Sequence, residues 1–252
     1  MNTAARRVAF GKIVGNEARL TWRRPVGLVG GVGIPVLLVV IFGELPAFAK
    51  HPGSFGGLSV FAAYVPVLAA FGIGLLALLG LPMPLASYRE IGVLRRLSTT
   101  PVPRSWLLAA QGVIQAGIAV AEVVIVIVVS VAAFGQAAPK SPAGLALAVA
   151  VTIAGLLSIG LLIAAVARSA NAASVTGQLV FFPLIFFAGL WFPRPLMPAV
   201  LLDISDYTPL GAAVQAMQDA MRTGFPPAAP LLVLAGYAVV FGFLAWRFFR
   251  WE

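Results

Sequence analysis

The run WLLAAQGVIQAGIAVAEVVIVIVVSVAAF, residues 106–134, contains one charged side chain, Glu122, and no proline. A helix of about 20 apolar residues crosses the roughly 30 Å hydrocarbon core of a bilayer, and this run exceeds that length. Inside a bilayer, a chain must satisfy its own backbone N–H and C=O groups, which a helix does. The run therefore predicts a transmembrane α-helix.

Five further apolar runs, separated by charged residues and prolines, are typical of the same structure. Hydrophobic residues make up 61% of the 252 positions and charged residues 10%, which excludes a water-soluble globule. No stretch alternates over about ten residues as the strands of a transmembrane barrel do. We therefore predict an all-α polytopic membrane protein with one domain, residues 1–252. The six spans are predicted at 26–43, 58–81, 106–134, 143–167, 174–192 and 229–249.

The distribution of Lys and Arg predicts the orientation of the chain. If the N-terminus is cytoplasmic, 13 of the 17 basic residues lie on the cytoplasmic side. The four on the outer side are Lys50, Lys140, Arg194 and Arg222. This asymmetry obeys the positive-inside rule, so both termini are predicted to be cytoplasmic. The formal net charge of +9 then needs no nucleic acid as a partner.

Residues 87–100, SYREIGVLRRLSTT, predict one short amphipathic helix on the cytoplasmic side. Ser87 and Glu90 have the spacing of a capping box, and Pro101 disfavours helical geometry at the residue before it. One face is basic, and the apolar face consists of Ile91, Val93, Leu94 and Leu97. Two interpretations remain open: contact with anionic lipid headgroups, or docking to a partner protein whose movement tilts the flanking spans.

Residues 1–25 predict a second amphipathic helix, lying along the inner leaflet. Its apolar arc contains Phe10, Ile13, Val14 and Leu20, and its basic arc contains Lys12, Arg19 and Arg23. On the opposite side of the membrane, prolines end the fifth span. Residues 193–228 are then interpreted either as short re-entrant helices in the outer leaflet or as an ordinary extracellular loop.

Glu122 and a set of aromatic residues are candidates for a transport pathway. An ionised carboxylate at the centre of a span costs about 3 kcal/mol, so Glu122 should face protein or water. It could carry a proton, make a polar helix contact or line a cavity. The aromatic candidates, which suit a hydrophobic substrate and equally suit lipid, are Phe61, Tyr64, Phe71, Phe181, Phe182, Phe186, Phe187 and Trp191. Close helix approach, including at a subunit interface, is predicted at Gly72, Gly74, Gly177 and Gly189.

The sequence lacks the motifs of several catalytic chemistries. It has no G-x-x-x-x-G-K-[ST] loop to cradle phosphates, no H-E-x-x-H and no G-x-S-x-G. It has no cysteine, and the single His51 has no carboxylate cluster around it, so no metal site is predicted. The chain is therefore not expected to be an enzyme.

Three segments resemble a known family. The first is Tyr88-Arg89-Glu90-x-Gly92-x-Leu94-Arg95-Arg96-Leu97-x-Thr99-Thr100-Pro101-Val102, followed by Arg104 and Leu107-Leu108. The others are Gly189-x-Trp191-Phe192-Pro193 and Ser205-x-x-Thr208-Pro209-Leu210. Together with the six spans, they resemble the permeases of type-2 ATP-binding-cassette transporters, including the daunorubicin-type drug exporters, over nearly the whole chain.

The resemblance implies how the chain works and with which partners. Residues 87–100 would be a coupling helix seated in a cleft of a separate ATPase, with docking residues Arg89, Glu90, Ile91, Gly92, Leu94, Arg95, Arg96, Leu97, Thr99 and Pro101. Two permeases, identical or homologous, would meet through their second and fifth spans above two ATPase subunits in a bacterial plasma membrane. ATP and Mg²⁺ would be bound by the ATPase and no cofactor by this chain. An outer gate would contain Phe192, Pro193, Tyr207 and Pro209.

The function implied is the ATP-driven export of a hydrophobic or amphiphilic compound, such as a drug, an antibiotic natural product or a lipid, by alternating access. One alternative is a proton-coupled secondary transporter that uses Glu122. The other is a membrane-embedded enzyme.

Overall fold

The computed structural model contains helices and no strand within the residues that it describes, which are 3–23, 25–49, 59–92 and 105–248. The predicted all-α class is confirmed. The elements in chain order are α1 (Thr3–Arg23), α2 (Pro25–Leu28), η1 (Val29–Gly33), α3 (Ile34–Glu44), α4 (Pro46–Ala49), α5 (Val60–Leu75), η2 (Leu76–Gly80), α6 (Pro82–Glu90), α8 (Ser105–Phe134), α9 (Pro142–Val166), α10 (Ala170–Ala188), η3 (Arg194–Leu196), α11 (Ala199–Tyr207), α12 (Pro209–Arg222) and α13 (Ala228–Phe248).

Five helices of the described chain are long and apolar enough to cross a membrane. They are Val60–Glu90, Trp106–Phe134, Pro142–Val166, Ala170–Ala188 and Ala228–Phe248. The last four begin and end within a few residues of the predicted spans. The multi-span architecture is thus confirmed with five helices of full length.

The first predicted span, 26–43, corresponds to a shorter apolar helix, Val29–Glu44. Leu28 and Gly33 both have helical dihedral angles, so α2, η1 and α3 form one continuous helical run from Pro25. The run ends at Glu44 because Leu45 is extended, as is usual for a residue that precedes proline.

Two segments with π-helical hydrogen bonding, η1 and η2, interrupt the apolar helices just before prolines. Pro35 follows η1 and Pro82 follows η2, and neither can donate the backbone hydrogen bond that an α-helix requires there. After η2, the N–H of Leu81 donates to the carbonyl of Leu76, five residues back, at 3.0 Å. The wider turn keeps each helix continuous past its proline.

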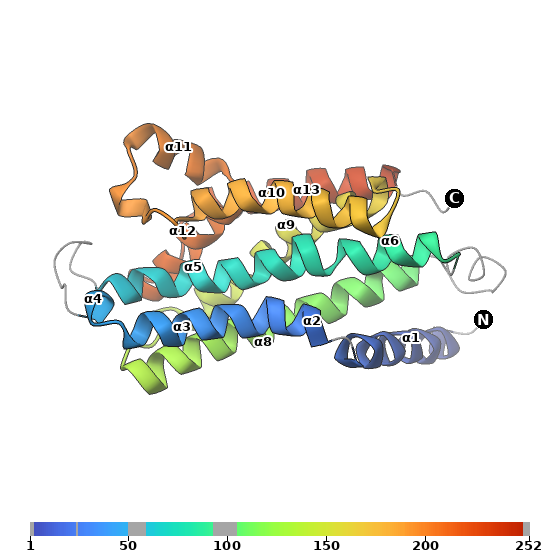
Figure 1. Cartoon of the computed structure of the whole chain (residues 1–252), viewed down its shortest axis with the longest axis horizontal. Coiled ribbons are helices and arrows are strands. Elements are labelled where there is room, and N and C mark those ends of the chain that lie inside the picture. Colours follow the sequence, from blue (N-terminus) through green and yellow to red (C-terminus); the bar gives the residue numbers. More distant parts are fainter. Residues whose placement is uncertain (1–2, 24, 50–58, 93–104, 249–252) are drawn as a thin grey trace.

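The run α5–η2–α6 is the central helix of the bundle (Figure 1). It contacts α3, α8, α9, α10 and α12, and nearly all of its side chains between Phe61 and Leu78 are buried. α1, the C-terminal end of α6 and the C-terminal end of α13 lie at one end of the bundle, and α4 and α11 lie at the other. We call these the α1 end and the α11 end.

The predicted helix over residues 87–100 does not begin at Ser87. Ser87 lies inside α6, which continues the second span well beyond its predicted end at residue 81. The carbonyl of Ser87 accepts a hydrogen bond from the N–H of Ile91 at 3.1 Å, so this residue propagates a helix and does not cap one. The helix ends at Glu90, and Gly92 turns the chain with a φ of +70°, a conformation that favours glycine. Residues 93–100 lie outside the described residues.

The region 193–228 contains three short helices, η3, α11 and α12. α10 ends at Ala188, before the predicted residue 192, because Gly189 adopts the left-handed conformation that stops many helices. One face of α12 is buried against α5, α9 and α10, where Leu210, Val214 and Met217 are fully enclosed. α12 is therefore a part of the bundle core at the α11 end.

Candidate functional site

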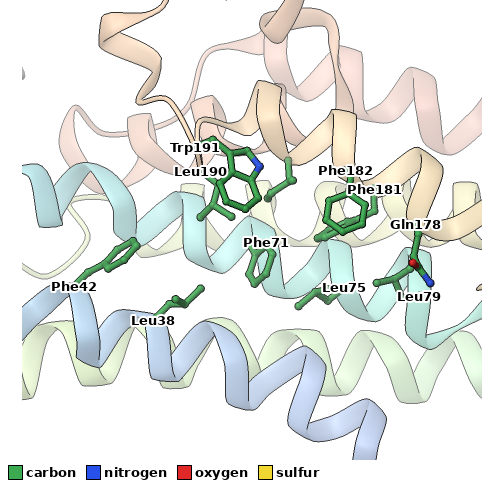
Figure 2. A pocket seen from close by; sticks show the side chains of 11 residues that line it. Leu38, Phe42, Phe71, Leu75, Leu79, Gln178, Phe181, Phe182, Leu190 and Trp191 are labelled. Atoms are coloured by element: carbon green, nitrogen blue, oxygen red, sulfur yellow. The ribbon is translucent and has the colours of Figure 1, made fainter.

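An apolar pocket of about 470 Å³ lies between α3 and α10, with α5 and η2 between them (Figure 2). Gln178 is the polar residue of its lining, and the other side chains are aliphatic or aromatic. The lining consists of Leu38, Phe42, Phe71, Leu75, Leu79, Gln178, Phe181, Phe182, Ile185, Leu190 and Trp191. Sites for small organic molecules have volumes of about 300–1,000 Å³ and a lining of this kind.

Helical spacing explains why these side chains gather. Phe71, Leu75 and Leu79 are four residues apart and lie on one face of the central helix. α10 presents a matching face through residues 178, 181, 182 and 185. Phe71 and Phe181 pack with their ring centroids 5.6 Å apart. This approach requires Gly74, because a Cβ there would lie 2.9 Å from the ring of Phe181.

The pocket contains four of the nine predicted pathway residues: Phe71, Phe181, Phe182 and Trp191. Gly189 has a φ of +94°, and the turn that it makes carries Leu190 and Trp191 to the pocket (Figure 2). Leu38, Phe42 and Gln178 also line the pocket and were not predicted. Gln178 is four residues before Phe182 on a helix, and that spacing could have suggested it.

The other predicted aromatic residues lie elsewhere. Phe61 packs on Phe134 with a centroid distance of 5.3 Å, and Tyr64 packs on Phe42 at 5.3 Å and on Phe48 at 5.6 Å. The rings of Phe186 and Phe187 pack on each other, outside the pocket lining. Of the predicted aromatic residues, Phe71, Phe181, Phe182 and Trp191 thus line the pocket, whereas Phe61, Tyr64, Phe186 and Phe187 do not.

Glu122 does not line the pocket. Its side chain is 0% exposed and fills the space that Gly72 leaves, where a Cβ would overlap the carboxylate. Within the described residues, neither carboxylate oxygen has a hydrogen-bond partner. Gly72 thus accommodates a side chain of the same subunit, as Gly74 does, and Gly177 accommodates the backbone carbonyl of Leu78, whereas Gly189 ends a helix. The close helix approach at Gly72, Gly74 and Gly177 is therefore made within the subunit, and a role of these glycines at a subunit interface stays a prediction.

At the α1 end, a buried carboxylate links three helices. Glu17 of α1 is 7% exposed, and it accepts hydrogen bonds from the Tyr88 hydroxyl of α6 at 2.9 Å and from Gln111 Nε2 of α8 at 2.5 Å. Phe10 packs edge-on against Trp106 nearby, with centroids 5.7 Å apart. α1 therefore packs along the first turns of α8. Sequence reasoning missed Glu17, although it is an acidic residue at the centre of an otherwise apolar arc.

The predicted docking residues that are described lie at the end of α6. The guanidinium of Arg89 donates to the carbonyl of Ala167 at 2.8 Å and to that of Ala165 at 3.4 Å, which holds α6 to the end of α9. Glu90 and Ile91 are exposed beside Gly92. The predicted residues Leu94, Arg95, Arg96, Leu97, Thr99 and Pro101 lie outside the described residues.

At the α11 end, Arg194 is the centre of a polar cluster. Its guanidinium, 7% exposed, forms an ion pair with Asp206 and donates to the Ser205 hydroxyl and to the carbonyl of Gly211 at 3.3 Å. The Ser205 hydroxyl in turn donates to the carbonyl of Phe187 at 2.6 Å. We call Arg194, Ser205, Asp206, Phe187 and Gly211 the Arg194 cluster. It ties α10, α11 and α12 together.

The predicted gate residues surround this cluster without converging on one point. Pro193 directly precedes Arg194, and Pro209 is the buried first residue of α12. Phe192 is exposed, and the Tyr207 side chain is 73% exposed. The backbone carbonyl of Tyr207 accepts a hydrogen bond from Tyr237 of α13 at 3.1 Å. Sequence reasoning did not identify Arg194 or Ser205 as the residues that join these segments.

Within the described residues, no group of three or more His, Asp or Glu side chains could hold a metal ion. A comparison with protein families finds a match over residues 9–222 to the family described as ABC-2 type transporter. The matched region runs from α1 through α12 and includes the pocket, the Glu17 contacts and the Arg194 cluster. A comparison with curated proteins found no match.

Proposed function

The chain belongs to the ABC-2 type transporter family and is therefore the permease subunit of an ABC exporter that works with an ABC ATPase; we propose that its cargo is a hydrophobic or amphiphilic compound. The pocket between α3 and α10 carries this proposal. Its surface is almost wholly apolar, so a hydrophobic molecule that enters it is removed from water. This transfer is favourable by about 25 cal/mol of free energy for each Å² of apolar surface buried. Gln178 provides one hydrogen-bonding group that could orient a polar substituent.

We further propose that a second permease subunit, identical or homologous, closes the pocket. Beside the pocket, α10 exposes an apolar stripe of Val175, Leu179, Phe182 and Phe186. The central helix is mostly buried within the subunit, so α10 would provide most of the contact and α5 only the pocket floor. When two such subunits associate, their two pockets would line one shared pathway. The two ATPase subunits would then switch that pathway between access from one side of the membrane and access from the other.

The proposed topology places six spans in a bacterial plasma membrane, with Val29–Glu44 as the first and with the α1 end in the cytoplasm. α1 is proposed as the interfacial helix, and the chain from Arg89 to Pro101 as the part that docks on the ATPase. η3, α11 and α12 are proposed as re-entrant elements that bear the outer gate. ATP and Mg²⁺ would be bound by the ATPase subunits.

Transport of daunorubicin, used as a fluorescent amphiphilic probe, tests the cargo site. We expect inside-out vesicles containing the permease and its co-expressed ATPase to accumulate the probe only with ATP. Phe182→Ala should raise the KM for the probe about three- to tenfold, because it removes part of the apolar contact between the probe and an aromatic ring of the pocket lining. Phe243→Ala on α13, an exposed phenylalanine outside the pocket lining, is the matched control. Equal KM values for the two variants would remove the pocket from the pathway.

Substitution of Glu122 separates this function from a proton-coupled carrier. Glu122→Gln keeps the shape that fills the space at Gly72, so we expect ATP-driven transport within about twofold of wild type. Collapse of the proton gradient with an uncoupler should also leave transport unchanged when ATP is supplied. The carrier would be favoured instead if a proton gradient alone drove transport and Glu122→Gln abolished it.

A further inference from the structure

α1 is rotated so that one of its charged residues, Glu17, faces the bundle and not the surface of the protein. Along this helix, Lys12, Arg19, Trp22 and Arg23 are exposed, whereas the carboxylate of Glu17 is buried against the bundle. At 100° per residue, Glu17 lies at the centre of the apolar arc that holds Phe10, Ile13 and Leu20. An apolar residue there would attach α1 to the bundle without the cost of desolvating a charge.

The two hydrogen bonds of Glu17 explain what a carboxylate adds at this position. Apolar contacts tolerate a helix that slides or rotates, whereas a carboxylate that accepts from Tyr88 and Gln111 fixes one register between α1, α6 and α8. Hydrogen bonds to a charged group are also stronger than neutral ones. A buried polar contact of this kind serves positional specificity more than stability.

The same turn of α6 holds a fourth helix. Tyr88 binds α1 through Glu17, and the adjacent Arg89 binds the C-terminal carbonyls of α9. Both residues lie within four positions of Gly92, where the chain turns after the end of α6. A displacement of the end of α6 therefore pulls on α1 through one contact and on α9 through the other.

We propose that Glu17 is a positioning residue that makes α1 move with the end of α6 when the ATPase acts on the adjoining segment. This inference rests on the proposed function, because it requires an ATPase that displaces that segment. α1 leads through α2 and η1 into α3, one wall of the pocket, so its displacement would reach the pocket from the side opposite α10.

Distance measurements between spin labels test the inference, and the cysteine-free chain allows labels at chosen positions. Gly15→Cys labels α1 and Met83→Cys labels α6, and both side-chain positions are exposed. Trp246→Cys on α13, 77% exposed, provides a reference outside the contacts of Glu17. The distances are measured in the complex with its ATPase, first without nucleotide and then trapped with ATP and vanadate.

In the complex with Glu17 intact, we expect the α1–α6 distance to stay the same in both states while the α1–α13 distance changes. In Glu17→Ala, the α1–α6 distance should differ between the states, and the α1–α13 change should be lost. Daunorubicin-stimulated ATP hydrolysis should fall about tenfold or more, because the variant loses both hydrogen bonds to the carboxylate and one such bond is worth about tenfold. Thr21→Ala is the matched control, because the hydrogen bond that its hydroxyl donates lies within α1, to the carbonyl of Glu17.

Four further observations keep the test decisive. The amount of co-purified ATPase must be equal in Glu17→Ala and in Thr21→Ala, which separates positioning from assembly. If Glu17→Ala does not fold, Tyr88→Phe removes a single hydroxyl donor and should show the same changes in weaker form. An unchanged α1–α6 distance in the two states, with normal stimulated hydrolysis, overturns the role of Glu17 alone. A wild-type chain that recruits no ATPase overturns the proposed function and this inference with it.

Discussion

Gly177→Ala is expected to lower the Tm of the permease in detergent by about 2–12 °C, the result of roughly 1–3 kcal/mol of overpacking at about 2–4 °C per kcal/mol in a chain of this size. A Cβ on Gly177 of α10 would overlap the carbonyl oxygen of Leu78 in η2, and one on Gly160 of α9 would overlap that of Ala77. These neighbours are backbone atoms, which cannot change rotamer to make room. Gly160→Ala should therefore be destabilising to a similar extent.

Two glycines on the bundle surface provide matched controls. At Gly117 of α8 and Gly236 of α13, an added Cβ would have no described atom within 4 Å apart from the nearby backbone of its own helix. Alanine at either position should leave the Tm unchanged or raise it slightly, since alanine favours a helix over glycine by about 0.5–1 kcal/mol. The measurement is the monodisperse fraction that survives heating, followed by size-exclusion chromatography. If Gly177→Ala were as stable as Gly236→Ala, the close packing of η2 between α9 and α10 would be wrong.

The ends of the helices show which parts of the fold the sequence could predict. Long apolar runs such as residues 106–134 predict a span with accurate ends, because the membrane core imposes one length on every such helix. The end of α6 was misplaced, because a capping-box pattern at Ser87 is a local signal and the helix entering from Pro82 overrides it. Sequence spacing likewise gave no indication of the π-helical turns before Pro35 and Pro82.

The pocket was only partly predictable, because its membership depends on how each helix is rotated. Phe71 and Phe181 meet where Gly74 allows it, whereas Tyr64, two turns before Phe71 on α5, packs on Phe42 instead. Glu122 was expected to face protein or water, and it is enclosed by protein. That it fills the space at Gly72 follows from a contact between α5 and α8, which one sequence does not reveal.

Arg194→Ala should have the largest effect of any substitution at the α11 end. Removing the guanidinium leaves Asp206 without its ion-pair partner and takes one partner from the Ser205 hydroxyl. Breaking a buried charged contact costs about 3–5 kcal/mol, and we expect the lower part of that range because Asp206 is partly exposed and can be hydrated. The Tm should fall by about 6 °C or more, at 2–4 °C per kcal/mol.

Two further variants separate the geometry of Arg194 from its charge. Arg194→Lys keeps the charge but loses the planar fork that reaches Asp206, Ser205 and Gly211 together, so it should recover only part of the lost stability. Arg222→Ala removes an exposed arginine at the end of α12 and should change the Tm by less than about 2 °C. If Arg194→Ala were no more harmful than Arg222→Ala, the cluster would not be what holds α11 and α12 to α10. The Ser205 hydroxyl also donates to the carbonyl of Phe187, two residues after the pocket residue Ile185 in α10. Loosening the cluster should therefore free the segment from Gly189 to Trp191 and alter the pocket from its α11 end.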